Sequence, residues 1–218
     1  MPGCFVMRTE MSEKTIADQV DEMGRAMAEQ PANPATEVFA AEQQALRERG
    51  VPAGVAEKEA PLPDAELLDA TGTSVTLSDA LGSVPAVVVF SRGVWCPYCN
   101  LALATYQCGL QPALAERGAV LVAISPQRLD GSLSVQAKHD LSFRVLSDPG
   151  NTVAGALGIT VTPGDDVLAA PRAWPRLGRG QRRSVARKRS SASLIVHRPL
   201  RPDIRQPSSE PVWLSPAR

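Results

Sequence analysis

The chain has 218 residues, with 23 basic and 23 acidic side chains that give a formal net charge of zero. Its 44% hydrophobic content excludes a collagen-like chain and one that is disordered throughout, and it permits one ordinary core. The charge is unevenly spread. Residues 171–218 hold 12 basic and 2 acidic residues, a net of +10, and residues 1–170 hold the other 11 and 21, a net of −10. We therefore treat the chain as two compositions.

The sequence lacks the patterns of membrane-spanning and secreted proteins. No apolar run approaches the roughly 18 residues that span a bilayer, and residues 1–10 contain no apolar stretch fit for a secretory signal. Four cysteines are too few for a disulfide scaffold. We therefore expect a cytoplasmic location, where closely spaced cysteines are catalytic or metal-binding more often than structural.

Two amphipathic helices are predicted ahead of the main domain. Apolar residues recur at steps of three or four from Ser12, a possible N-cap, to about Gln30, and a second helix spans residues 36–49. A linker rich in Pro, Ala and Glu follows at residues 53–63. We assign residues 1–60 to a helical N-terminal extension and linker.

Residues 61–163 alternate between expected strands and helices. The clearest strand is AVVVF at residues 86–90, a continuous apolar run typical of a strand buried on both faces. Pro112 lies inside an expected helix and should kink it. The order predicts an α/β layered fold with parallel strands. Strands are expected at 67–68, 74–77, 86–90, 119–125 and 143–146, and helices at 97–117, 132–140 and 151–157.

Residues 164–218 have a different composition and form an expected disordered basic tail. From residue 171 onward there are 7 Pro, 7 Ser and 11 Arg with little periodicity, and only residues 193–196 hint at a strand. Such a segment buries too little surface to offset a chain entropy of about 1–2 kcal/mol per residue. Between Arg172 and Arg189 one Trp and no Phe or Tyr is available for base stacking, which argues against specific nucleic-acid binding.

The strongest motif is Trp95-Cys96-Pro97-Tyr98-Cys99, directly after the central strand and at the start of a helix. A cysteine at a helix N-terminus is stabilised as a thiolate by unpaired N–H groups and the helix dipole. Pro97 suits the first helical turn, and a cysteine three residues after the first is close enough for a disulfide. Arg92 adds positive potential or orients an oxygen anion, Trp95 covers the site, and Tyr98 is a further supporting residue.

Zinc binding is the main chemical alternative to a redox pair. A structural zinc site needs four ligands, usually as two closely spaced pairs. The remaining candidates are scattered along the sequence with no second pair, and we expect neither a metal nor another cofactor. They are Cys4, Cys108, His139 and His197.

The segment FSRGVWCPYCN at residues 90–100 resembles the thioredoxin superfamily, and more narrowly the alkyl hydroperoxide reductase/thiol-specific antioxidant (peroxiredoxin-like) family. Supporting matches are LDATG at 68–72, VTLS at 75–78, VAISP at 122–126 and VLSDPG at 145–150. The resemblance covers about residues 60–163. It implies a thioredoxin-like three-layer fold for residues 61–163.

The resemblance leaves open which cysteine attacks first. On the peroxiredoxin pattern P-x-x-x-T-x-x-C, Cys99 takes the peroxidatic place, with Cys96 in place of Thr and Arg92 in place of Pro. On the thioredoxin pattern, Cys96 attacks and Cys99 resolves. We favour Cys96, because we expect the first cysteine of the helix to be more exposed than the one a turn later.

The C-terminal part departs from the family. The resemblance implies a proline-led strand, a hairpin strand and a last helix, for which only Thr162-Pro163 offers a start. The fold is therefore expected to be incomplete. We hypothesise that a reading-frame change near residue 170 produced the basic tail.

The resemblance implies an antioxidant peroxidase that takes a hydroperoxide and is restored by an external dithiol such as a thioredoxin. Two alternatives stay open: a protein disulfide reductase, and an inactive binding module with a truncated fold. The sequence predicts no membrane partner and gives no oligomeric state.

Overall fold

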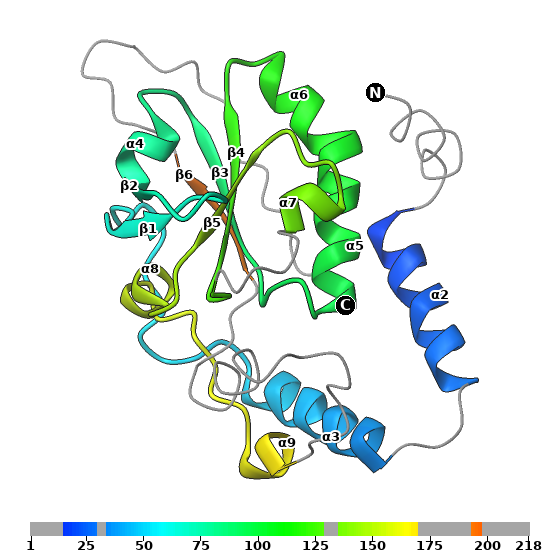
Figure 1. The fold of residues 1–218 in the computed structure, drawn as a ribbon. Coiled ribbons are helices and arrows are strands. Elements are labelled where there is room, and N and C mark those ends of the chain that lie inside the picture. The colour runs from blue at the N-terminus through cyan, green and yellow to red at the C-terminus, as the bar shows by residue number, and fades with distance from the viewer. Residues whose placement is uncertain (1–14, 30–33, 129–134, 170–192, 198–218) are drawn as a thin grey trace.

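The computed structural model describes residues 15–29, 34–128, 135–169 and 193–197 (Figure 1). A mixed sheet lies between two sets of helices. The helices are α2 (Ile16–Ala28), α3 (Pro34–Arg49), α4 (Leu77–Leu81), α5 (Pro97–Thr105), the π-helix η1 (Tyr106–Leu110), α6 (Gln111–Ala115), α7 (Val135–Lys138), α8 (Thr152–Ala156) and α9 (Asp165–Ala169). The strands are β1 (Glu66–Leu68), β2 (Ser74–Thr76), β3 (Ala86–Phe90), β4 (Val120–Ser125), β5 (Arg144–Ser147) and β6 (Ser193–His197).

The centre of the sheet is parallel, as the sequence predicts. The strand order is β2-β1-β5-β4-β3-β6. Strand β3 pairs parallel to β4 with Val88 opposite Val122, and β4 pairs parallel to β5 with Ile124 opposite Leu146. All five residues of β3 are buried, which confirms that AVVVF is a strand covered on both faces.

The edges of the sheet are antiparallel. Strands β1 and β2, both expected from the sequence, form a hairpin that joins β5 through the pair Leu68 and Ser147. On the other side β6 runs antiparallel to β3, with Ile195 opposite Val88. The weak strand signal at residues 193–196 is therefore confirmed as a strand of this sheet.

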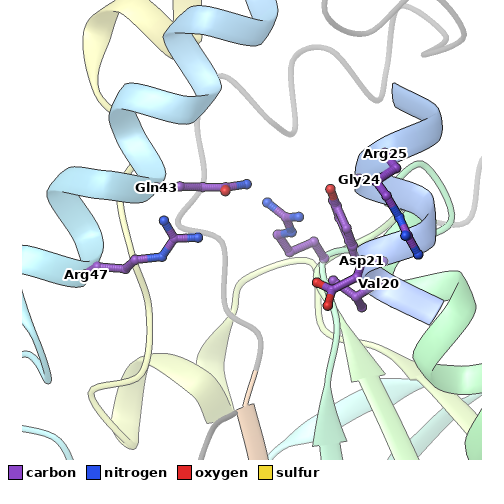
Figure 2. Close-up of a pocket in the computed structure, with 8 residues that line it drawn as sticks. Val20, Asp21, Gly24, Arg25, Gln43 and Arg47 are labelled. Carbon is purple, nitrogen blue, oxygen red and sulfur yellow. The ribbon is translucent and has the colours of Figure 1, made fainter. Parts of the chain in front are cut away.

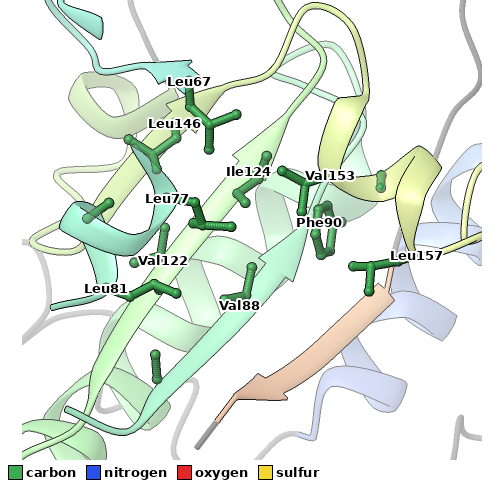
Figure 3. Packing of buried hydrophobic residues seen from close by; sticks show 13 residues of the cluster. Leu67, Leu77, Leu81, Val88, Phe90, Val122, Ile124, Leu146, Val153 and Leu157 are labelled. Carbon is green, nitrogen blue, oxygen red and sulfur yellow. The ribbon is translucent and has the colours of Figure 1, made fainter. Parts of the chain in front are cut away.

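Alternate residues of the central strands build two cores, one on each face. Val88 and Phe90 lie in the core beneath α4 and α8 (Figure 3). Val87 and Val89 lie in the opposite core, where Leu103 of α5 joins them. This alternation gives the predicted three-layer α/β arrangement, because each strand residue faces the helices of one side only.

The single helix expected at 97–117 is divided into α5, η1 and α6. Pro112 lies near the start of α6 and has no N–H to donate to the preceding turn. The predicted disturbance therefore takes the form of a wide π-helical turn directly before this proline, at residues 106–110.

The two N-terminal helices are present with shifted starts. Helix α2 begins at Ile16, after Thr15, whose Oγ1 accepts a hydrogen bond from Asp18 N at 3.1 Å. Asp18 Oδ2 accepts in return from Thr15 N at 2.8 Å, which forms a capping box. Thr15 therefore caps the helix, and Ser12 lies outside the described residues. Helix α2 contacts α5 and lies beside it (Figure 1).

Helix α3 is tied to the segment after the predicted domain end. It contacts α9, and Gly164 N donates to Glu42 Oε1 at 3.2 Å. The predicted tail, residues 164–218, thus includes α9 and β6. Its other residues, 170–192 and 198–218, on which the expectation of disorder falls, lie outside the described residues. Helix α7 is shorter than the expected helix 132–140, of which residues 132–134 are also outside them.

A search of the described helices found none with the length and apolar character needed to cross a membrane.

One close backbone contact generates a stability prediction. Gly158 has φ +69°, and a Cβ built there would lie 2.2 Å from the carbonyl oxygen of Gly54. We expect Gly158→Ala to lower the free energy of unfolding by about 2–4 kcal/mol, from the left-handed backbone plus the backbone clash. Urea unfolding measures this loss.

Two controls separate the causes. Gly118 has φ +64° with no atom within 4 Å of the added Cβ, so Gly118→Ala should cost only about 1–2 kcal/mol. Gly155 is helical with similar open space, so Gly155→Ala should be neutral or stabilising by up to about 1 kcal/mol. Equal losses for Gly158→Ala and Gly118→Ala would contradict the steric part of the argument.

Candidate active site

The Cys96–Cys99 motif lies where β3 passes into α5. The sheet pairing extends one residue beyond β3, because Ser91 N donates to Ile124 O at 2.8 Å. The loop 92–95 then turns back, and Cys96 becomes the N-cap of α5, with Pro97 in the first turn. The predicted strand–loop–helix context of the motif is therefore confirmed.

The two cysteine sulfurs accept three hydrogen bonds. The Sγ of Cys96 accepts a hydrogen bond from the Cys99 backbone N–H at 3.3 Å, as an N-cap side chain does. It also accepts one from Nη2 of Arg92 at 3.1 Å. The Sγ of Cys99 accepts from the Arg92 backbone N–H at 3.5 Å. The predicted supporting role of Arg92 thus has a direct geometric basis.

These contacts separate the two thiols in acidity. The hydrogen bond from the Cys99 thiol, the charge of Arg92 and the Cys99 backbone N–H together outweigh burial and lower the pKa of Cys96 to about 6. The pKa of Cys99 is raised well above its ordinary value, because its proton is held in the hydrogen bond to Cys96 and because the group is buried. One sulfur is therefore suited to carry negative charge and the other to carry the proton.

Cys96 was favoured as the attacking cysteine on the expectation that it is exposed, and the structure shows that it is buried. Relative exposure is 0% for Cys96 and 9% for Cys99, so the expectation that Cys96 is the more exposed is wrong. The loop folds back over the first cysteine, since Cys96 N donates to Gly93 O at 3.1 Å and Arg92 contacts its sulfur. Cys96 is therefore the more deeply buried of the two cysteines, and what favours it as the attacking residue is its acidity.

The other predicted supporting residues lie around the motif in different ways. The Arg92 guanidinium carbon lies 5.3 Å from the centroid of the Trp95 ring, a cation–π distance. Tyr98 is half-buried and lines a pocket together with Arg92. Pro97 is exposed and starts the helix.

Two residues that hold the active-site loop were given no role by the sequence analysis. Gln127 Oε1 accepts from Val94 N at 2.7 Å, and Asn100 Nδ2 donates to Val94 O at 2.7 Å. A Cβ on Gly93 would lie 2.8 Å from the same Gln127 oxygen, so the loop is packed against it. Gln127 directly follows the VAISP match at 122–126, and that proximity was the only available signal.

Tyr106 is a further neighbour that sequence reasoning missed. Burial raises the pKa of its phenol, and the electrostatic influence of Cys99 raises it further. Cys108, in η1, is half-buried and is not in a disulfide. Among the described residues, no group of three or more His, Cys, Asp or Glu side chains is arranged to hold a metal ion.

A pocket of about 670 Å³ opens beside the motif, between the N-terminal extension and the loop. Helices α2 and α3 supply most of its lining, and Figure 2 shows Gln43 and Arg47 extending from α3 toward α2. The lining residues are Val20, Asp21, Gly24, Arg25, Gln43, Arg47, Arg92 and Tyr98. Arg92 therefore belongs to both the thiolate site and the pocket.

Solved structures of redox proteins are similar to this chain at low identity. Peroxidoxin BcpB from Mycobacterium tuberculosis is 23% identical, with 63% of this chain and 74% of that chain covered and a TM-score of 0.45. The bacterioferritin comigratory protein of Xanthomonas campestris is 15% identical, with 69% of this chain and 79% of that chain covered and a TM-score of 0.46. The thioredoxin domain of a thiol-disulfide oxidoreductase from Bacteroides vulgatus is 17% identical, with 50% of this chain and 78% of that chain covered and a TM-score of 0.41.

A search of curated proteins found no match to the chain, but a family model matches it over a long segment. The family model described as AhpC/TSA family matches residues 59–180, which is more than half of the chain and includes both cysteines of the motif. This family supports a thiol-dependent redox function and agrees with the α/β sheet described above. The chain belongs to the AhpC/TSA family.

Proposed function

We propose that the protein reduces hydroperoxides with Cys96 and Cys99 as a two-cysteine centre. The observation that carries the proposal is the Cys96 sulfur, whose pKa is lowered to about 6 and which accepts a hydrogen bond from Arg92 at 3.1 Å. At pH 7 a thiol with that pKa is about nine-tenths ionised. The thiolate is the nucleophilic form of cysteine.

In the first step the Cys96 thiolate attacks one oxygen of the hydroperoxide. An S–O bond forms and the O–O bond breaks, which leaves Cys96 as a sulfenic acid and releases an alcohol once the departing oxygen takes up a proton. The Arg92 guanidinium has several N–H donors and already lies next to the sulfur. In this proposal Arg92 stabilises first the thiolate and then the negative charge that develops on the departing oxygen.

In the second step Cys99 resolves the sulfenic acid. Its proton passes to the hydroxyl of the sulfenic acid, its sulfur bonds to Cys96 Sγ, and water leaves. The raised pKa of Cys99 keeps that proton in place until the sulfenic acid forms. The Cys96 Sγ already accepts a hydrogen bond from the Cys99 backbone, so the pair is close enough for disulfide formation within one helical turn.

An external dithiol then completes the cycle. Two thiol–disulfide exchanges pass two electrons to the Cys96–Cys99 disulfide and restore both thiols. The net reaction converts a hydroperoxide and a dithiol into an alcohol, water and a disulfide. We propose a thioredoxin-type protein as the reductant and a reducing compartment such as the cytoplasm as the location.

Burial favours a small oxidant over a protein disulfide. The Cys96 side chain has 0% exposure, and a hydroperoxide requires a much smaller opening than a folded protein partner. The low pKa would nevertheless serve a protein disulfide reductase equally well. Reduction of insulin without consumption of peroxide would therefore replace the peroxidase by the reductase. No activity together with a broad, non-cooperative melt would favour an inactive module.

Single-turnover thiol counting tests the two-cysteine mechanism. The chain has four cysteines, so with one equivalent of hydrogen peroxide and no reductant we expect the denatured wild type to fall from four titratable thiols to two. Cys99→Ser should consume the peroxide and lose one thiol, with a sulfenic acid trapped by dimedone. Cys96→Ser should consume none.

Cys108→Ser is the matched control, since Cys108 is a half-buried cysteine of η1 that lies outside the Cys96–Cys99 motif and is not in a disulfide. It should fall from three thiols to one. Peroxide consumption by Cys96→Ser, with a sulfenic acid trapped on Cys99, would reverse the assigned order of attack.

The pH dependence of alkylation tests the role of Arg92. Iodoacetamide should modify Cys96 with a midpoint near pH 6, because the rate follows the thiolate fraction and the pKa is about 6. Arg92→Gln removes a positive charge that favours the thiolate, so the pKa rises and the midpoint moves upward. At pH 6 we expect the rate to fall at least about fivefold.

Two further variants make the test specific. Arg92→Lys keeps the charge and should give an intermediate midpoint, and Arg144→Gln removes an exposed arginine on β5 and should leave the midpoint near pH 6. Equal shifts in Arg92→Gln and Arg144→Gln would show that the effect is not local to the sulfur.

A further inference from the structure

The pocket next to the motif concentrates positive charge in an otherwise acidic part of the chain. Within their bounds, α2 and α3 have six acidic residues and three arginines. Two of the three arginines, Arg25 and Arg47, line the pocket, whereas only Asp21 of the six acids does. With Arg92 the lining has three guanidinium groups and one carboxylate, a net of +2 before the Cys96 thiolate is counted.

The other lining groups are suited to an organic anion. The amide of Gln43 supplies N–H donors and the hydroxyl of Tyr98 supplies an O–H donor. Val20 and Gly24 give an apolar strip along α2, on which a short hydrocarbon chain can lie. A volume of about 670 Å³ is within the range of small-molecule sites.

The arginines of the two helices are available to a ligand. Within the described part of the chain, neither Arg25 nor Arg47 has a side-chain ion pair or hydrogen bond, and both are exposed. Arg92 is committed to the Cys96 sulfur. Figure 2 shows Arg47 on the α3 side of the pocket and Arg25 on the α2 side, so a ligand can pair with one of these guanidinium groups while its other end reaches Arg92, the partner of the reactive sulfur.

We propose that this pocket, which we call the arginine pocket, binds the carboxylate of a small organic co-substrate that reacts at Cys96. The carboxylate pairs with Arg47, whose guanidinium group matches a carboxylate in shape and charge, and Arg25 on the α2 side adds positive charge. The apolar chain extends toward Val20 and Gly24 of α2, and the reactive end of the molecule reaches Arg92. The inference rests on the proposed function for its reaction and on the lining residues for its binding.

Two molecules of the redox cycle have the required chemistry. A hydroperoxide that bears a carboxylate would oxidise Cys96 by the first step given above. A thiol that bears a carboxylate would attack the Cys96 sulfur of the disulfide, form a mixed disulfide with Cys96 and release Cys99 as a thiol. A second thiol would then release Cys96 and leave with the first as a disulfide.

Direct binding tests the pocket without any redox step. Hexanoate and its neutral analogue hexanamide are titrated against the reduced full-length protein by ligand-observed NMR. For a ligand of eight non-hydrogen atoms we expect a dissociation constant of about 1 mM for hexanoate, and binding at least about fivefold weaker for hexanamide. A rise in salt from low to high should weaken only the hexanoate complex.

Variants assign the binding to the arginine pocket. Arg47→Gln should weaken hexanoate binding by about fivefold, and Gln43→Glu should weaken it further by adding a negative charge, with hexanamide unaffected in both. Arg49→Gln removes an exposed arginine of the same helix that does not line the pocket, and it should bind hexanoate like the wild type. Matching melting temperatures exclude unfolding as the cause.

Kinetics then identify the co-substrate. One arm compares KM for 6-hydroperoxyhexanoate with KM for its methyl ester, and the other compares 3-mercaptopropionate with 2-mercaptoethanol as reductant. A lower KM for the carboxylate in either pair, lost in Arg47→Gln and kept in Arg49→Gln, supports the proposal and names the source.

Two results would overturn the inference. Equal affinity for hexanoate and hexanamide, or equal loss in Arg47→Gln and Arg49→Gln, would remove the arginine pocket as a carboxylate site. Hexanoate binding without a carboxylate preference in either kinetic pair would remove it as a co-substrate site. The binding titration gives a result even if the protein consumes no peroxide. Failure of the proposed function can therefore be distinguished from failure of the carboxylate site.

Discussion

A negative charge on the buried sulfur of Cys96 is the constraint on which the site depends. A thiolate without exposure to water is costly unless fixed donors replace the water, and here the Cys99 backbone N–H and the Arg92 guanidinium do so at 3.3 and 3.1 Å. Both donors are set by the backbone path, one by the start of α5 and the other by the loop after β3. The path of the backbone therefore determines the acidity of the Cys96 thiol.

The loop that presents Arg92 needs its own support, because it contains Gly93 in a conformation with φ +120°. Gln127 and Asn100 hold it from two sides through the N–H and C=O of Val94, each at 2.7 Å. Gln127 is in turn fixed by the ends of the strands, since Ser147 Oγ donates to its carbonyl. The parallel strands β4 and β5 thus position the loop as well as forming the core.

The sequence predicted those parts of the structure that depend on local pattern. AVVVF gave a strand buried on both faces, and the residues at 96–99 gave a helix start with a cysteine as its cap, because period and capping chemistry are written in neighbouring residues. The exposure of Cys96 was predicted wrongly, since it depends on how the loop folds back. Gln127 could not be found, because its partner Val94 is 33 residues away. The arginine pocket joins residues from three separate segments and has no sequence signature either.

Arg92 links the thiolate to the arginine pocket, and this sets a requirement on how an anion binds there. A carboxylate that paired with Arg92 itself would compete with Cys96 for the same guanidinium, raise the pKa of the thiol and lower the fraction present as the reactive thiolate. A carboxylate held by Arg47 on α3 leaves Arg92 with the sulfur. The N-terminal extension thus supplies positive charge for the ligand, because Arg92 cannot bind a carboxylate and still stabilise the Cys96 thiolate. It also explains why arginines lie at the pocket although most charged residues of α2 and α3 are acidic.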